Sequence, residues 1–134
     1  MKLSAILADL HVFEGQVNWA KPLRLALVFD DGSSLRLDVG AEGETLIVDR
    51  LPLEGPIDMD DYGRVEVHDI THLLGAGLGR IEAGPPVVVR DEAGRAIGVS
   101  VPLVGRETLC FWADGDELHC ARQERPHRRH VRSR

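Results

Sequence analysis

The sequence predicts a mainly β fold, in which an antiparallel sheet built from consecutive hairpins closes into a barrel or folds into a sandwich, with at most one or two short helices. Several short segments alternate apolar and polar residues, which is the period of a strand with one buried face. Glycine-bearing turns separate these segments, and no long segment has the 3.6-residue period of an amphipathic helix.

The amino-terminal segment leaves two structures open. Leu3, Ile6, Leu7 and Leu10 have helical spacing. Leu10 and Val12 fit the start of a strand equally well, so periodicity does not decide between helix and strand here.

The clearest hairpin covers residues 23–39. Leucines alternate with other residues on both sides of a three-residue loop that ends at Gly32. A loop of this length with glycine last favours a type I turn closed by a left-handed residue. This turn places Leu27 opposite Leu35 and Leu25 opposite Leu37.

The middle of the chain is predicted to contain one strand and one long loop. Residues 45–50 form the strand, with Leu46 and Val48 on the same face. Residues 51–63 form the loop, because they combine prolines and glycines with several acidic side chains.

Strand character returns in residues 64–70. Residues 71–74 follow as a single predicted helical turn, with Asp69 or Thr71 as its amino-terminal cap. Residues 78–82 fit one more short strand.

The last strand-rich stretch, residues 87–120, predicts two hairpins. In the first, the polar loop 91–95 places Val89 opposite Ile97 and Val87 opposite Val99, which gives one apolar face.

The second hairpin turns at Asp114-Gly115, a dipeptide preferred in type I′ turns. This register places Phe111 opposite Leu118 and Leu109 opposite Cys120. Pro102, between the two hairpins, marks an edge position, a bulge or a strand end, because proline cannot donate to a sheet.

Charge divides the 134 residues into two parts. Residues 1–120 are predicted to form a single globular domain, and residues 121–134 a basic Arg/His-rich tail. Residues 1–119 hold 10 Lys and Arg against 21 Asp and Glu, a net charge of −11, whereas residues 120–134 hold 6 against 1, or +5. The body should repel nucleic acid, and the tail could attract it.

The two cysteines predict no disulfide. In the expected register Cys110 and Cys120 point to opposite faces of one hairpin, so free thiols and a reducing compartment are expected. The amino terminus lacks the pattern of a signal peptide, and no apolar run approaches the length of a membrane span. We therefore expect a soluble, cytoplasmic protein that does not bind membranes.

His68, His72 and Asp69 are the candidate metal ligands. Two histidines four residues apart would share one face of a helix, as in zinc hydrolases. The surrounding residues predict a strand entering a turn, where such residues lie about 13 Å apart. The sequence therefore predicts no metal site and no other cofactor.

Asp58, Asp60 and Asp61 have the spacing of a calcium loop, but Tyr62 occupies the third ligand position and Asp69 the twelfth. We predict a solvated acidic loop.

Cys110, His119 and Glu117 are the candidate catalytic residues. The Asp-Gly register makes Cys110 and His119 cross-strand neighbours, and Glu117 could orient the imidazole. Nothing in the sequence supplies an oxyanion hole or a substrate pocket, so no catalytic site is predicted.

By elimination, the sequence favours a small non-catalytic protein-binding module of the inhibitor or immunity type. Its acidic surface or an exposed sheet edge would meet a protein with a basic surface. Two alternatives stay open: nucleic-acid binding through the tail, and a small hydrolase that uses Cys110 with His119 or a metal at His68 and His72. The oligomeric state is left open.

Overall fold

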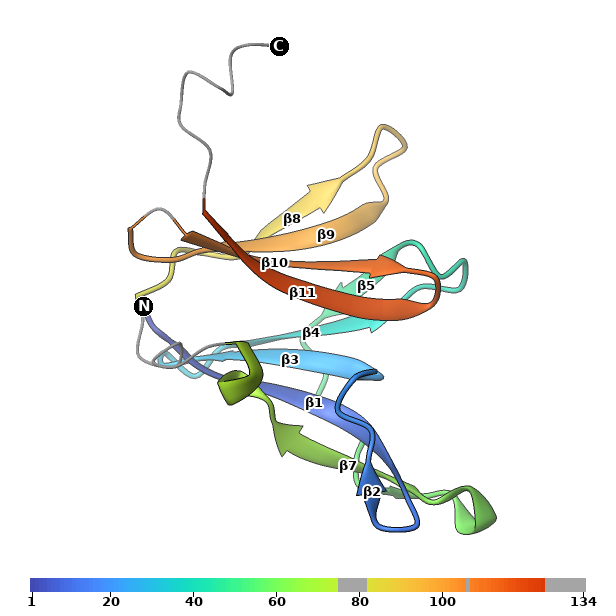
Figure 1. Ribbon diagram of the computed structural model, residues 1–134. Coiled ribbons are helices and arrows are strands. Elements are labelled where there is room, and N and C mark those ends of the chain that lie inside the picture. The colour runs from blue at the N-terminus through green and yellow to red at the C-terminus, as the bar shows by residue number, and fades with distance from the viewer. Residues whose placement is uncertain (75–81, 106, 125–134) are drawn as a thin grey trace.

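The computed structural model describes residues 1–74, 82–105 and 107–124, which form two antiparallel sheets that face each other (Figure 1). The mainly β prediction is confirmed. The sheets do not close into a barrel, and their arrangement is that of a sandwich.

The first sheet contains the first seven strands. They are β1 (Leu3–Phe13), β2 (Gln16–Val17), β3 (Arg24–Phe29), β4 (Ser34–Val39), β5 (Leu46–Asp49), β6 (Ile57–Asp58) and β7 (Arg64–Asp69). Their order across the sheet is β5-β4-β3-β1-β7-β6, and β2 pairs with the end of β1.

The second sheet contains β8 (Val87–Arg90), β9 (Ala96–Pro102), β10 (Glu107–Asp114) and β11 (Glu117–Glu124), in the order β11-β10-β9-β8. Two short 3-10 helices, η1 (Asp60–Tyr62) and η2 (Thr71–Leu74), are the helices of the described residues. None of the helices in this part of the chain is long and apolar enough to cross a membrane.

β1 resolves the ambiguity of the amino terminus. It is a strand whose register against β3 shifts between Leu3 and Ala5. After this irregularity Ile6, Ala8 and Leu10 alternate and are fully buried. The shift explains the helical spacing of Leu3 and Ile6, because an extra residue in a strand puts two inward side chains three positions apart.

The β3–β4 hairpin confirms the register predicted for residues 23–39. Leu25 pairs with Leu37 and Leu27 with Leu35. Gly32 has a φ of 88°, as the left-handed closing position of the loop requires.

The inward faces of the two sheets form one hydrophobic core. The first sheet contributes mainly leucines, and the second contributes Val99, Val101, Leu109, Phe111 and Leu118. Burial of each of these side chains stabilises the sandwich by about 1.5–3 kcal/mol.

The predicted register of the β8–β9 hairpin is wrong by one residue. Val88, not Val87, pairs with Val99, because the register shifts between Val89 and Arg90. Val88 therefore faces the core, whereas Val87 and Val89 are 55% and 40% exposed. Pro102 ends β9, one of the three positions expected for it.

The predicted register of the β10–β11 hairpin is wrong by two residues. The residues at the centre of the turn are Gly115 and Asp116, with φ of 60° and 64°. Phe111 therefore faces Cys120 instead of Leu118. A shift of two residues keeps every side chain on its predicted face, so Cys110 and Cys120 point to opposite faces and both are free thiols.

The remaining predictions hold in part. The loop predicted for residues 51–63 contains β6 and η1, and the expected helical turn at residues 71–74 is η2. Residues 78–81 of the predicted short strand lie outside the described residues. β11 continues through residues 121–124, and the rest of the predicted tail, residues 125–134, is also outside them.

The outward faces of the two sheets differ in charge. On the first sheet, Asp9 lies opposite Arg24, and Arg36 opposite both Ala26 and Asp49. On the second, Asp114 and Glu117 lie on the outward face beside the β10–β11 turn, and the other outward positions between this turn and the middle of β8 carry no Asp, Glu, Lys or Arg. We call this uncharged part the neutral face. The strand registers assign to it Val87, Val89, Gly98, Ser100, Cys110, Trp112, His119 and Ala121.

Candidate functional site

The candidate catalytic residues do not form the predicted arrangement. His119 lies opposite Trp112, and their rings stack with centroids 5.6 Å apart. Cys110, two positions before Trp112 in β10, lies opposite Ala121, so the predicted cross-strand pairing of Cys110 with His119 is wrong. Glu117 pairs with Lys21 at 3.1 Å.

The candidate metal ligands His68 and His72 lie around Trp19, a residue that the sequence analysis missed. Their rings approach the indole edge-on, with centroid distances of 5.2 and 6.0 Å. His68 Nε2 lies 2.9 Å from Glu66 Oε1, and this contact lowers the pKa of the Glu66 carboxyl. Among the described residues no group of three or more His, Cys, Asp or Glu side chains is placed to hold a metal ion.

Asp69 caps η2. Its carboxylate accepts hydrogen bonds from the hydroxyl and the backbone N–H of Thr71, and these bonds lower the pKa of Asp69. The cap expected at this turn is therefore confirmed, with Asp69 as the capping side chain.

A small hollow of about 280 Å³ lies beside Trp19, where η2 and β11 meet the loop between β2 and β3. His119 and Cys120 line it together with Leu73. Burial raises the pKa of the Cys120 thiol. Nucleophilic cysteines depend on a lowered pKa, so the environment of Cys120 does not favour nucleophilic chemistry.

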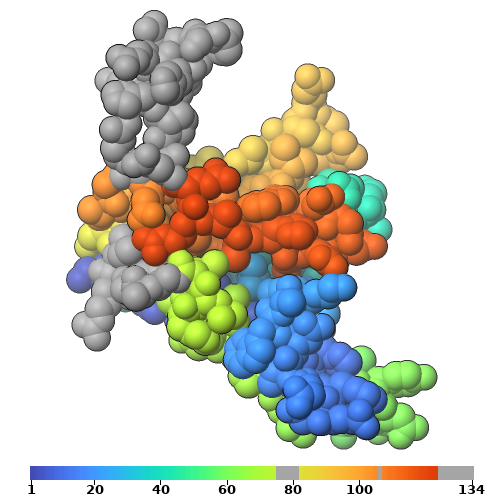
Figure 2. All heavy atoms as spheres, viewed as in Figure 1, coloured from blue at the N-terminus to red at the C-terminus, as the bar shows by residue number. Residues whose placement is uncertain are grey.

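A larger hollow, of about 610 Å³, lies at the opposite end of β7. The turn between β1 and β2 forms one wall, and the connection from β6 through η1 to β7 forms the other. Both segments project at the lower end of the molecule, away from the second sheet (Figures 1 and 2). We call the exposed surface around this hollow the acidic tip, and it consists of Phe13, Glu14, Asp58, Asp60, Asp61 and Tyr62.

The backbone of the acidic tip is held in place by close contacts. Gly63 has a φ of 89°, and a Cβ at this position would clash with the carbonyl oxygen of Val12 on β1. The Met59 N–H donates to the Gly63 carbonyl at 2.9 Å, which closes the turn around η1. His11 hydrogen-bonds the carbonyl of Tyr62 and so ties β1 to the same turn.

The two aromatic side chains of the acidic tip are exposed to solvent, and its carboxylates have no ion-pair partners among the described residues. Tyr62 is 73% exposed and Phe13 is 44% exposed. None of the four carboxylates of the tip forms an ion pair within the described residues. Arg64 also lines the hollow, but its guanidinium pairs with Glu66, so the tip keeps a net negative charge beside its apolar contact area.

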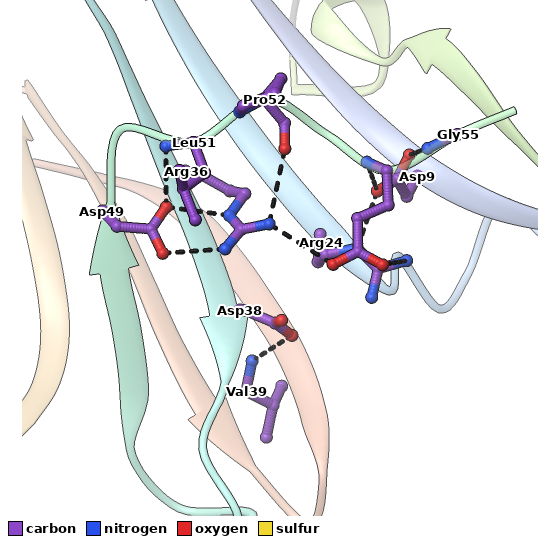
Figure 3. Close-up of polar contacts among 10 residues, drawn as sticks. Asp9, Arg24, Arg36, Asp38, Val39, Asp49, Leu51, Pro52 and Gly55 are labelled. Carbon is purple, nitrogen blue, oxygen red and sulfur yellow. Dashed lines mark hydrogen bonds and ion pairs between the residues drawn. The ribbon is translucent and has the colours of Figure 1, made fainter.

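The segment that enters the hollow from β5 is anchored by a buried carboxylate (Figure 3). Asp9 is fully buried and accepts hydrogen bonds from the backbone N–H groups of Glu54 and Gly55, both at 2.9 Å. Arg24 Nε donates to the same carboxylate at 2.7 Å. These bonds fix Gly55 directly before Pro56, the first residue of this segment that lines the hollow.

A second ion pair extends this anchor across the sheet. Arg36 donates two hydrogen bonds to Asp49, at 2.8 and 2.9 Å, and its Nη1 lies 3.5 Å from Glu54 (Figure 3). The bond to Arg36 lowers the pKa of the Asp49 carboxyl. Glu54 also lies 3.9 Å from Arg24, so it links the two arginines.

Known proteins supply no family for this chain: neither family models, nor curated proteins, nor solved structures give a match.

Proposed function

We propose that this protein is a non-catalytic protein-binding module that holds a basic segment of its partner at the acidic tip. The observation that carries this proposal is the combination of four exposed carboxylates without ion pairs and two exposed aromatic rings around the largest hollow described above.

The tip has the groups that recognise arginine and lysine. A guanidinium or ammonium group is attracted to the face of an aromatic ring, and Tyr62 and Phe13 present such rings. Carboxylates give charge-assisted hydrogen bonds to the same cations. The hollow between the β1–β2 turn and the connection from β6 to β7 provides room for a side chain of the partner.

The charge of the whole body supports the same partner. The net charge of −11 in residues 1–119 attracts a basic segment over long distances and speeds its encounter with the tip. Anchoring by Asp9 keeps one wall of the hollow fixed before binding, which lowers the entropy cost of association.

A nona-arginine peptide tests the proposal by titration calorimetry at low and moderate salt. The double variant Asp60→Asn with Asp61→Asn should weaken binding about five-fold, because exposed ion pairs contribute up to about 1 kcal/mol each. Asparagine tolerates the positive φ of 55° at residue 60. Tyr62→Ala should weaken binding about three-fold through loss of the cation–π contact.

The matched control is the double variant Glu92→Gln with Asp116→Asn. It removes the same number of negative charges from exposed positions outside the tip, and residue 116 also has positive φ. Binding by the control should stay within about two-fold of the original, which is the range of screened long-range charge effects. Equal losses in both double variants would show general charge attraction and reject the acidic tip as the site.

A further inference from the structure

β8 is an edge strand whose outer side has no partner strand among the described residues. Its side chains are Val87, Val88, Val89 and Arg90. The β8–β9 hairpin stands out from the sandwich at the upper right (Figures 1 and 2). An edge strand exposes backbone N–H and C=O groups that another strand can pair with, and proteins usually protect such edges with charges or prolines inside the strand.

The other strands that end the two sheets carry acidic residues. β5 contains Asp49, β6 contains Asp58 and β11 contains Glu117. β8 contains no acidic residue, and the neutral face continues from it across β9 and β10. It is therefore the edge where two copies of an acidic protein can approach without placing like charges opposite each other.

We propose that β8 pairs antiparallel with β8 of a second copy, around a two-fold axis at Val88. The three valines read the same in both directions, so Val87 lies opposite the partner's Val89 and Val88 opposite the partner's Val88. The two four-stranded sheets become one continuous sheet, and the neutral faces of both copies lie side by side.

The charge and the side chains of β8 both favour a second copy of the chain as its partner. A basic partner segment finds no attracting charge at β8, which carries Arg90, whereas the acidic tip offers it carboxylates. A second copy supplies both the missing backbone partners and a matching row of β-branched side chains, which pair favourably across strands. Val88 packs against the core and is only partly buried, so a second copy at this edge also covers more of its side chain.

The proposed pairing can be tested by placing charges at residues 87 and 89 and measuring the oligomeric state by sedimentation equilibrium over a range of concentrations. The original chain should be a dimer. The variant Val87→Lys with Val89→Lys places like charges opposite each other in both contacts and should be monomeric. The variant Val87→Glu with Val89→Lys places opposite charges in the same two contacts and should dimerise. Val104→Lys, at a position 63% exposed outside β8, should dimerise like the original chain.

Hydrogen exchange of the original chain gives a second readout that needs no variant. Backbone amides of β8 should exchange more slowly as the dimer forms, while those of η1 should not change. A monomer at every concentration, or equal dimerisation of the two charged double variants, would overturn the proposal. The outcome is independent of peptide binding at the acidic tip, so either proposal can fail without the other.

Discussion

Asp9 shows how a single buried charge determines the path of a loop. Its side chain lies on the outward face of the first sheet, where a carboxylate would normally be solvated, yet it is fully buried. The burial is possible because Arg24 and two backbone N–H groups satisfy its oxygens. A buried carboxylate is stable when several donors bond to its oxygens. An uncharged side chain at the same position would leave the charge of Arg24 without its partner.

Replacing Asp9 should destabilise the protein strongly. Asp9→Ala leaves Arg24 and the N–H groups of Glu54 and Gly55 without their acceptor, which costs about 3–5 kcal/mol. Asp9→Asn keeps one acceptor oxygen and should cost about 2 kcal/mol. Urea denaturation measures both, and Glu92→Gln at an exposed position should change stability by less than about 0.5 kcal/mol. A loss below about 1 kcal/mol for Asp9→Ala would mean that the anchor is not needed.

The two cysteines should differ in reactivity. Burial raises the pKa of the Cys120 thiol, so its thiolate is scarce at mildly alkaline pH. Alkylation of a Cys110→Ser variant with iodoacetamide should therefore be about ten-fold slower than alkylation of a Cys120→Ser variant. In urea the two variants should react at the same rate. Faster reaction of Cys120 in the folded protein would instead support a nucleophilic role for it.

Among the secondary-structure elements, the strand register of a hairpin can be predicted only where its turn residues allow a single arrangement. In the β3–β4 hairpin, the loop length and Gly32 leave one arrangement that keeps the leucines inside, and it is the observed one. In the β10–β11 hairpin, Asp114, Gly115 and Asp116 can all occupy a turn, and the observed turn is one position later than the Asp-Gly pair predicts. The register shift in β8–β9 depends on which valine reaches the core, which the local sequence does not specify.

Substitutions at Gly63 and Gly94 would distinguish the cost of backbone strain from the cost of a steric clash. Both have positive φ, of 89° and 83°. A Cβ at Gly94 meets open space, whereas one at Gly63 clashes with the Val12 carbonyl. Gly94→Ala should therefore cost about 1 kcal/mol, and Gly63→Ala about 3 kcal/mol or more. Urea denaturation gives both values, and equal costs would show that β1 moves away from the turn without resistance.

At the scale of the whole molecule, the charge of the candidate site could be predicted and its assembly could not. The acidic segment containing Asp58, Asp60 and Asp61 is recognisable from the sequence. Its position beside Glu14 depends on the pairing of β1 with β7, two strands far apart in the chain. The same pairing places His68 in a strand beside Trp19, which no local pattern indicates. Long-range strand pairing is decided by burial in the assembled sandwich.

The ion pairs of the first sheet predict how stability depends on pH. In the folded protein the pKa of Asp49 is lowered, chiefly by its bonds to Arg36. The unfolded chain, where an aspartate has a pKa of about 3.9, therefore binds more protons than the folded protein as the pH falls. The stabilisation is complete at neutral pH, begins to decrease as the pH approaches about 4, and is lost as the pH falls through the folded pKa. Asp69, bonded to Thr71, contributes with the same sign.

Urea denaturation between pH 7 and pH 3 checks this dependence. The original chain should be about equally stable at pH 7 and pH 5.5 and lose stability steeply below pH 4. Asp49→Asn should lower stability at pH 7 by about 2 kcal/mol, because it removes charged hydrogen bonds to Arg36. It should also make the acid decline shallower, since one depressed carboxylate no longer titrates. Asp61→Asn removes an exposed carboxylate instead and should keep the original slope. If Asp49→Asn left the pH dependence of stability unchanged, the acid sensitivity would come from groups other than the Arg36–Asp49 ion pair.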